Sequence, residues 1–410
     1  MLVETSIDLT DLDRFATGFP YQVFDQLRAE APVWFHPATA HTPDDEGFWV
    51  LSRYDDIVAA AADKATFSSE SGGRRSGGGT MIEDMPAGWV VGSMLNMTDD
   101  PRHAQIRRLL TPGLTPRSLA GIEAEMRSRA HAIVDSALAK RDCDFLVDVA
   151  AELPLQAVAQ LAGVPQQDRH ELMQWANVTL DYEDREVGQQ TERLAEAQAK
   201  MLAYGSALLE RKRLHQAGDL LSIITQARIE GEPLSENEQR MFLSLIIAAG
   251  SETTRNSIAL GVAALSERPD EWNRLREDRA LLPAAVEEIL RWASSTPYNR
   301  RTATRDIEIR GQRIPAGDKV TLWWASANRD DAVFDNPYVF DTTRNPNPHL
   351  GFGRGTHFCL GAPLARMEIR VMLDVLLDNV RSITLTGAVE YIRSNKHTGV
   401  RHMPVNMDAR

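Results

Sequence analysis

The spacing of apolar residues divides the chain into a helical middle and two flanks that carry short strands. From Pro101 to Trp292, apolar side chains recur at helical intervals almost throughout. Within this region, Ser235-Glu236-Asn237-Glu238 resembles a capping box ahead of a long apolar helix that ends near Leu265. A further helix is predicted from about Ala362 to Asn379. Helices therefore make up most of the predicted structure.

The flanks show the shorter apolar runs and turn residues that are typical of β-strands. In the stretch from Ser68 to Thr80, Gly72-Gly73 and Gly77-Gly78-Gly79 hold regular structure only at a cost in entropy. This Gly/Ser-rich stretch is either a linker between domains or a mobile loop within one domain, and the loop is favoured because no change of composition follows it. We expect a mainly α fold with small β-sheets, in a single domain over residues 1–410. The predicted strands are Val33-Trp34-Phe35, Phe48-Trp49-Val50-Leu51, Ile307-Glu308-Ile309, Arg313-Ile314 and Val320-Thr321-Leu322.

Charge and apolar length limit the kinds of partner. The chain has 45 Lys and Arg against 58 Asp and Glu, a net charge of −13, which argues against nucleic-acid binding. The most apolar stretch, Leu243 to Gly250, is far shorter than the ~20 residues that span a bilayer. Met1 to Leu12 lacks the basic and apolar regions of a signal peptide, and the only cysteines are Cys143 and Cys359. We therefore expect a cytoplasmic protein that binds neither nucleic acid nor membrane.

One of the two cysteines lies in a glycine-rich loop. The segment Phe352-Gly353-Arg354-Gly355-Thr356-His357-Phe358-Cys359-Leu360-Gly361 delivers Cys359 to the start of a helix, and Pro363 suits its first turn. Backbone N–H groups and the helix dipole there favour a negative sulfur, so we expect a lowered thiol pKa. The loop alone is equally compatible with a structural buried cysteine. A dinucleotide loop and a zinc site are disfavoured, because the glycine spacing is incomplete and the ligands are too few.

These ten residues resemble the haem-binding loop of the cytochrome P450 family at every defining position. The resemblance implies the cytochrome P450 fold, with haem b (iron protoporphyrin IX) between the long central helix and the cysteine loop. It implies that Cys359 is the thiolate ligand of the iron and that Phe352, Gly353 and Gly361 belong to the cofactor-binding loop. His357 stands where many members have arginine, and either side chain can donate a hydrogen bond to a haem propionate.

The long helix carries Ala249-Gly250-Ser251-Glu252-Thr253-Thr254 near its middle. Small residues at 249 and 250 would let a flat ligand approach the backbone. The hydroxyl of Thr253 can bond a carbonyl one turn back, and the carboxylate beside it can pass protons inward. Taken alone, the segment is typical of an ordinary polar helix surface. It also resembles the family's acid–alcohol motif, which implies Thr253 as the oxygen-activating hydroxyl, Glu252 as its proton-relay partner and Ala249 as a haem contact.

Three basic residues stand where the family places its propionate ligands. His103 and Arg107 are four residues apart and share one helical face, and Arg301 begins the later strand region. Without the resemblance, such a pair on a helix would indicate a solvated face. With it, His103, Arg107 and Arg301 are expected to bind the cofactor together with His357.

Two Glu-x-x-Arg pairs have the same helical spacing but different surroundings. Glu271 and Arg274 follow Pro269-Asp270 at a predicted helix start, where charges are usually solvated. Glu288 and Arg291 lie among apolar neighbours and resemble the family's structural ion pair. We assign this second pair to the scaffold and not to catalysis.

In the family, variable segments line the substrate pocket. The apolar residues of these segments are more often plain core than substrate contacts, whereas Asn299, Asn395 and His397 could orient a polar group. The apolar candidates are Val90, Val91, Met94, Leu95, Ile246 and Ala249. The segments around Glu252 and Arg393-Ser394-Asn395 resemble members that oxidise sterols, terpenoids and branched lipids. The corresponding segments are Met85 to Leu95, Trp175 to Arg185, Ile246 to Thr253, Ser294 to Asn299 and Ser394 to Gly399.

The sequence thus predicts a haem-thiolate monooxygenase that inserts one oxygen atom from O2 into a hydrophobic small molecule. Electrons would come from a separate ferredoxin and ferredoxin reductase, docking on a basic patch of Arg354, Arg366 and Arg370, although these could also be scattered solvated arginines. Two alternatives are a haem-binding sensor or carrier, which does not need Glu252 and Thr253, and a non-haem enzyme with Cys359 as nucleophile. Desaturation, C–C cleavage and phenol coupling would show nearly the same motifs.

Overall fold

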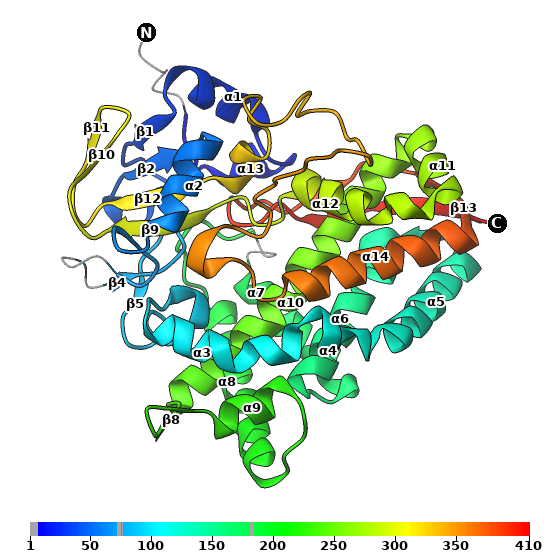
Figure 1. The fold of residues 1–410 in the computed structure, drawn as a ribbon, viewed down its shortest axis with the longest axis horizontal. Helices are drawn as coiled ribbons and strands as arrows, with labels where there is room; N and C mark the ends of the chain where they lie inside the picture. Colours follow the sequence, from blue (N-terminus) through cyan, green and yellow to red (C-terminus); the bar gives the residue numbers. More distant parts are fainter. Residues whose placement is uncertain (1–6, 72–74, 76, 181–183) are drawn as a thin grey trace.

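The computed structural model describes residues 7–71, 75, 77–180 and 184–410. Most strands lie at one end of the molecule and most helices at the other, with α10 running through the middle (Figure 1). The helices are α1 Tyr21–Glu30, α2 Tyr54–Ala62, α3 Arg102–Leu110, α4 Pro116–Ala120, α5 Glu123–Lys140, α6 Glu152–Ala162, α7 Arg169–Thr179, α8 Glu192–Leu214, α9 Leu220–Gln226, α10 Glu236–Ser266, α11 Pro269–Glu277, α12 Leu282–Ala293, α13 Trp324–Ala327 and α14 Ala362–Asn379.

The strands form several small sheets. The largest has the order β1-β2-β12-β9-β3, with β2 and β12 parallel and the other neighbours antiparallel. The strands are β1 Val33–His36, β2 Phe48–Leu51, β3 Phe67–Ser68, β4 Gly77–Gly78, β5 Met85–Pro86, β6 Asp142–Asp144, β7 Arg228–Ile229, β8 Glu232–Pro233, β9 Asn299–Ala303, β10 Ile307–Ile309, β11 Gln312–Ile314, β12 Lys319–Leu322, β13 Val380–Leu385, β14 Glu390–Tyr391, β15 Val400–His402 and β16 Pro404–Ala409.

The long helix α10 organises the core. Its capping box is present: the Ser235 hydroxyl accepts from the Glu238 N–H, and the Glu238 carboxylate accepts from the Ser235 N–H. From Ser251 to Val262 nearly every residue of α10 is buried. It packs against α6, α12 and α14, and the largest apolar cluster fills the space between them. A helix buried on nearly all sides can position groups deep inside the protein.

The predicted elements are largely confirmed, including both long helices and all five strands. The expectation for the glycine stretch was wrong at Gly77–Gly78, which pairs with Met85–Pro86 as a strand. A side chain at Gly78 would clash with the carbonyl of Glu70, so only glycine permits this pairing. Residues 72–74 and 76 of the predicted mobile loop lie outside the described residues. Among the described helices, none has the length and apolar character needed to cross a membrane.

Candidate active site

The cysteine loop precedes α14 and is anchored at both ends. The Cys359 N–H donates to the carbonyl of Phe352 at 2.9 Å, and Gly361 forms the N-terminal cap of α14. Gly355 lies against α2: a β-carbon there would come within 2.2 Å of the Ala61 carbonyl oxygen. Gly353 adopts a positive φ of 69°, a conformation that favours glycine. Gly353 and Gly355 therefore each have a geometric reason, and the loop is fixed against its surroundings.

The thiol of Cys359 does not have the lowered pKa that the sequence suggests. Cys359 is exposed as a whole residue, but desolvation of its thiol by the protein around the sulfur raises the pKa of Cys359, and the opposing effects of the Gly361 backbone N–H, the Arg107 charge and the Ala362 backbone N–H do not overcome it. The N–H groups that the helix start predicts are thus present at the sulfur, but their effect is too small by itself. A metal cation bound to the sulfur would supply the missing positive charge, because coordination deprotonates a thiol outright.

Four basic side chains gather beside this loop from three separate elements. His103 and Arg107 come from α3, Arg301 from β9 and His357 from the loop. The rings of His103 and His357 are 4.2 Å apart between centroids. Burial lowers the pKa of His357 to about 2, helped by the nearby charges of Arg301, His103 and Arg107. The structure therefore brings together all four residues that the sequence assigned to the propionates.

The two arginines of this cluster fit an anionic group. Among the described residues, neither Arg107 nor Arg301 has a carboxylate within ion-pair distance, and Arg301 donates only to the Arg300 carbonyl at 2.8 Å. Burial lowers the pKa of Arg301 to about 10, against a small opposing effect of Asp99. Buried charge without a partner is costly, so such a cluster is typical of an anion-binding site. Two haem propionates next to a cysteine ligand match this arrangement in sign and position.

The middle of α10 has one accessible side, a stripe formed by Ala249 and Thr253. Ala249 is exposed and Thr253 partly exposed, although their neighbours from Ser251 to Val262 are buried almost without exception. The Thr253 hydroxyl donates to the Ala249 carbonyl at 2.9 Å, which confirms the contact one turn back. The expectation for Gly250 was wrong. A β-carbon at Gly250 would meet Val158 of α6 at 2.5 Å, so Gly250 serves helix packing and only Ala249 opens the stripe.

Glu252 is turned away from this stripe into the protein and is held by other side chains. Its side chain is 1% exposed. Oε1 accepts from the Asn256 side-chain amide at 2.6 Å, and Oε2 lies 3.3 Å from Nδ1 of His397. The carboxylate and the Thr253 hydroxyl are adjacent in sequence, but they face different surroundings.

The two Glu-x-x-Arg pairs differ as expected. Glu288 and Arg291 are fully buried and joined by two hydrogen bonds of 2.7 Å, and Arg291 also donates to three backbone carbonyls. Glu271 and Arg274 form an ion pair in which Arg274 is 44% exposed. The buried pair ties α12 to the chain segment that leads into the cysteine loop.

The expected substrate-facing polar residues are engaged within the protein. Asn299 accepts from the indole of Trp324, Asn395 donates to the carbonyl of Leu9, and His397 contacts Glu252. The apolar candidates Val90 and Val91 are buried in a small cluster with Met97 and Met241. Residues 181–183 of the segment Trp175 to Arg185 lie outside the described residues. Ile246, Ala249 and Thr253 remain as accessible positions on α10.

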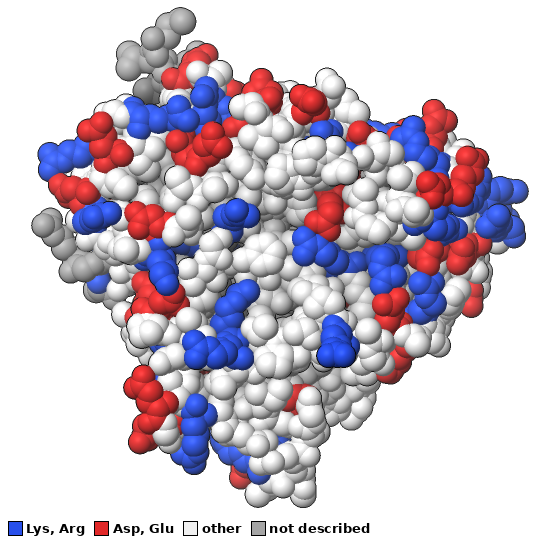
Figure 2. Space-filling view, viewed as in Figure 1, with Lys and Arg blue, Asp and Glu red and all other residues white. Residues whose placement is uncertain are grey.

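The expected basic patch needs revision. Arg366 makes a bidentate pair with Glu287 at 2.7 and 2.8 Å, and Arg370 pairs with Glu123 at 2.8 Å. Only Arg354 of the three is exposed and has no carboxylate within ion-pair distance in the described part of the chain. Figure 2 nevertheless shows Lys and Arg side chains spread over α3, α4 and the cysteine loop. Arg108 of α3 and Arg117 of α4 are exposed.

Two residues at the site were not recognised from the sequence. Asn256 lies four positions after Glu252 on the same helix, and this spacing could have indicated a side-chain contact. His397 was noticed only as a polar residue near substrate. Its contact with Glu252 spans 145 positions in the sequence and leaves no local signal.

Comparison with known proteins agrees with this geometry. A family model described as Cytochrome P450 matches residues 137–400. A Mycobacterium tuberculosis relative, whose name gives only its family and a number, cytochrome P450 126, is 46% identical over 407 residues, or 98% of either chain. Two others from that organism are a methyl-branched lipid omega-hydroxylase (40% identical, covering 97% of this chain and 94% of that protein) and a steroid C26-monooxygenase (36%, covering 98% and 93%).

A solved structure of Mycobacterium marinum cytochrome P450 CYP268A2 in complex with pseudoionone has a TM-score of 0.86 at 35% identity, covering 94% of each chain. Its fold and the fold described above are therefore alike over nearly their whole length. The chain belongs to the cytochrome P450 family, whose members are haem b monooxygenases and thus oxidoreductases. They use O2, a hydrophobic substrate and electron-donating partners.

Proposed function

We propose that this protein hydroxylates a branched hydrophobic molecule, with Cys359 as the iron ligand. The observation that carries the proposal is the cluster of four basic side chains around a cysteine that backbone N–H groups approach. Bound there, haem would supply the activation of O2 that no protein side chain can perform. Phe352, Gly353 and Gly361 would shape the loop under the haem, and Ala249 would lie against its other face.

The basic cluster has a binding role in this proposal. His103, Arg107, Arg301 and His357 would hold the two propionates and so fix the orientation of the haem plane. His357 would donate a hydrogen bond to a propionate from the cysteine loop. Arg107 and Arg301 would contribute charge-assisted hydrogen bonds, which are about twice as strong as neutral ones.

Proton supply is assigned to α10. The Thr253 hydroxyl, which donates to Ala249 on the accessible stripe, would receive protons and present them where O2 is bound. Glu252 would provide them after its carboxylate turns from the interior towards the stripe. This pair distinguishes an oxygenase from a haem-binding sensor, which needs no supply of protons.

The proposed substrate is a molecule with a branched alkyl end, such as a sterol, a terpenoid or a methyl-branched lipid. Support comes from the two relatives named as a methyl-branched lipid omega-hydroxylase and a steroid C26-monooxygenase. Both names describe attack near the end of a chain. The accessible positions Ile246, Ala249 and Thr253 carry no charged side chain, which suits such a chain end.

A ferredoxin, supplied by its reductase, is the proposed electron donor. It would dock on the face that carries Arg108, Arg117 and Arg354, because the donor's acidic surface is attracted to it. The remainder of the protein is acidic, with a net charge of −13, which favours this face over others. We place the reaction in the cytoplasm, where Cys143 and Cys359 stay reduced.

The test begins with the absorption spectrum of the reduced protein with carbon monoxide. Thiolate ligation predicts a strongly red-shifted Soret band in the wild type and its loss in Cys359→Ala. Incubation with a sterol, a terpenoid and a branched fatty acid should then change the spin state of the ferric protein and yield alcohols. An unshifted Soret band would overturn the assignment of Cys359, and tight substrate binding without turnover would favour a carrier.

A further inference from the structure

Two nitrogen-bearing side chains approach the buried carboxylate of Glu252 from different directions. On its own helix, the Asn256 amide donates to Oε1 at 2.6 Å. From a distant part of the chain, His397 brings Nδ1 to 3.3 Å from Oε2. Both oxygens therefore face a nitrogen, and one of these nitrogens belongs to a group that can carry a proton.

The loop that carries His397 is locked onto α10 and its neighbours. It joins β14 to β15, and the Val400 N–H donates to Oδ1 of Asn256 at 3.0 Å. The Asn256 amide thus uses its oxygen for the loop and its nitrogen for Glu252. The Thr398 N–H donates to the Ser295 carbonyl at 3.0 Å, which fixes the loop directly after His397. These contacts hold the imidazole and the carboxylate at a set distance.

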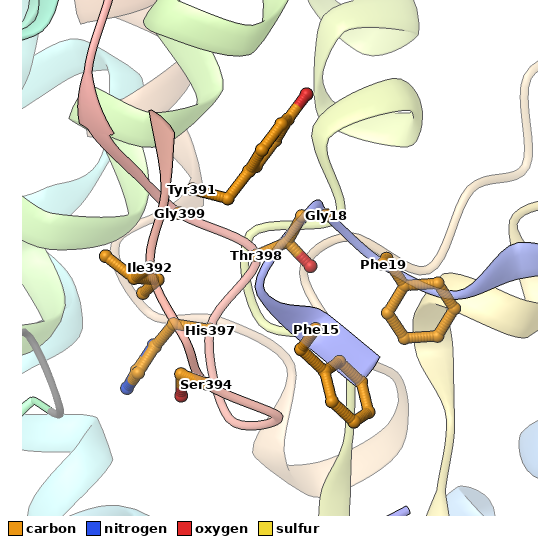
Figure 3. Close-up of a pocket in the computed structure, with 9 residues that line it drawn as sticks. All are labelled: Phe15, Gly18, Phe19, Tyr391, Ile392, Ser394, His397, Thr398 and Gly399. Carbon is orange, nitrogen blue, oxygen red and sulfur yellow. The ribbon is translucent and has the colours of Figure 1, made fainter. Parts of the chain in front are cut away.

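His397 is the more accessible partner of this pair. Its side chain is 16% exposed, whereas that of Glu252 is 1% exposed. The loop borders a narrow crevice against the N-terminal segment, and the ring of His397 points away from Phe15 and Phe19 (Figure 3). The imidazole therefore bridges from partial solvent contact to a carboxylate that has almost none.

We propose that His397 is a positioning residue of the proton supply: it holds the Glu252 carboxylate and passes it protons from the solvent side. The proposal rests on the function proposed above, in which Glu252 serves Thr253. In the transfer, the N–H bond at Nδ1 breaks and an O–H bond forms at Oε2. The ring enters this step as imidazolium and leaves it neutral; hydronium from the solvent then protonates the ring again and becomes water, so that no other reactant is required. Imidazole suits this task because its ordinary pKa lies near neutrality.

The same hairpin supplies a matched control. His402 on β15 also contacts a carboxylate, with Nδ1 2.6 Å from Oδ2 of Asp144, but its side chain is 52% exposed. This second pair lies at the surface and does not include Glu252. Substitution of His397 therefore removes the contact to Glu252, whereas substitution of His402 changes a histidine of the same hairpin and leaves that contact in place.

The experiment compares His397→Gln, His402→Gln and Glu252→Gln in the haem-loaded protein with a substrate that is turned over. Product formed per NADH consumed and the solvent deuterium isotope effect on turnover are measured, with KM as a further readout. We expect His397→Gln to slow turnover about tenfold or more, in line with loss of a general acid–base group, with a larger isotope effect and little change in KM. His402→Gln should behave as the wild type.

A second measurement needs no change at position 397. In the diamagnetic ferrous carbon monoxide form, histidine labelled with nitrogen-15 gives a signal for His397, and Glu252→Gln should shift its Nδ1 resonance while that of His402 stays. An unshifted signal, or normal turnover in His397→Gln when Glu252→Gln is slow, overturns the proposal for His397 alone. Normal turnover in Glu252→Gln overturns the relay itself, and the carbon monoxide spectrum shows independently whether the haem-thiolate assignment stands.

Discussion

Arg291 and Arg301 are ten residues apart and both almost completely buried, yet their surroundings differ. Arg291 shares two hydrogen bonds with Glu288 and donates to the carbonyls of Asn328, Pro337 and Val339. Arg301 has the Arg300 carbonyl as its acceptor and no carboxylate within ion-pair distance among the described residues. The protein itself supplies the hydrogen-bond and charge partners of Arg291, whereas Arg301 has a charge that only a bound ligand could neutralise.

This difference separates scaffold from binding site without reference to any motif. Burying a charge costs free energy of folding, so a protein that keeps a buried charge without an internal partner must recover that free energy from another interaction. For Arg301 and Arg107 the compensating free energy would come from binding an anionic ligand. For Arg291 it comes from the chain segment between α13 and the cysteine loop, which its hydrogen bonds hold in place.

The largest effect is expected from breaking the satisfied pair. Glu288→Gln leaves Arg291 buried without its counter-charge, which should destabilise the fold by about 3–5 kcal/mol. Urea unfolding monitored by circular dichroism measures the change. A loss below 1 kcal/mol would mean that water or another group compensates and that the pair is not the main anchor of this segment.

The unsatisfied arginine should show the opposite behaviour. Arg301→Leu removes a buried charge, so the haem-free chain should be at least as stable as the wild type. The haem-loaded protein should lose its haem roughly 10- to 100-fold faster, because a hydrogen bond to a charged group contributes about 1.5–3 kcal/mol. Transfer of haem to an excess of apomyoglobin measures this rate. The exposed Arg313, whose side chain is 78% exposed, provides the control Arg313→Leu.

A third, intermediate pair gives a prediction for pH. Burial alone would raise the pKa of Glu287, but hydrogen bonds from Arg366 and His349 outweigh it and lower the pKa from 4.5 to about 2. Because the folded-state pKa is depressed, this stabilisation is fully present above about pH 4.5 and is lost as pH falls towards 2. It should amount to about 2 kcal/mol after solvent screening. Glu287→Gln should flatten the acid limb of a plot of unfolding free energy against pH; an unchanged limb would contradict this.

The smallest effect is expected at the exposed pair. Arg274→Ala removes a contact with Glu271 in which the arginine is 44% exposed. Such pairs contribute 0–1 kcal/mol, so the midpoint of urea unfolding should hardly move. A loss as large as that of Glu288→Gln would remove the distinction between buried and exposed pairs on which the comparison rests.

The fold could be predicted well because its signals are local. The start of α10 follows from a capping box, and β1 and β2 follow from apolar runs between turn residues. The Thr253 contact with Ala249 was also predictable, since a helix places a side chain beside the carbonyl four residues earlier. The family motif pointed to Cys359 and the basic cluster, and the structure brings these together.

The features of the site that could not be predicted depend on tertiary neighbours that sequence spacing does not reveal. The pKa of Cys359 is raised because burial exceeds the effect of the nearby N–H groups, and burial depends on the whole fold. Arg366 was expected on a basic patch, but Glu287 lies within reach of it from a different helix. His397 reaches Glu252 because β14 and β15 carry their loop against α10. Each of these is a tertiary contact.

The packing at Gly250 bears on how this enzyme could be re-engineered. Ala249 and Gly250 are adjacent small residues, and a library built from the motif would randomise both. A side chain at 250 would clash with Val158, so variants at this position should be less stable than variants at 249. Position 249 is exposed, and in the proposed function diversity placed there would change the helix surface that faces the haem. Which positions of α10 tolerate a larger side chain therefore depends on what each small residue faces: the neighbouring helix α6 at 250, and open space at 249.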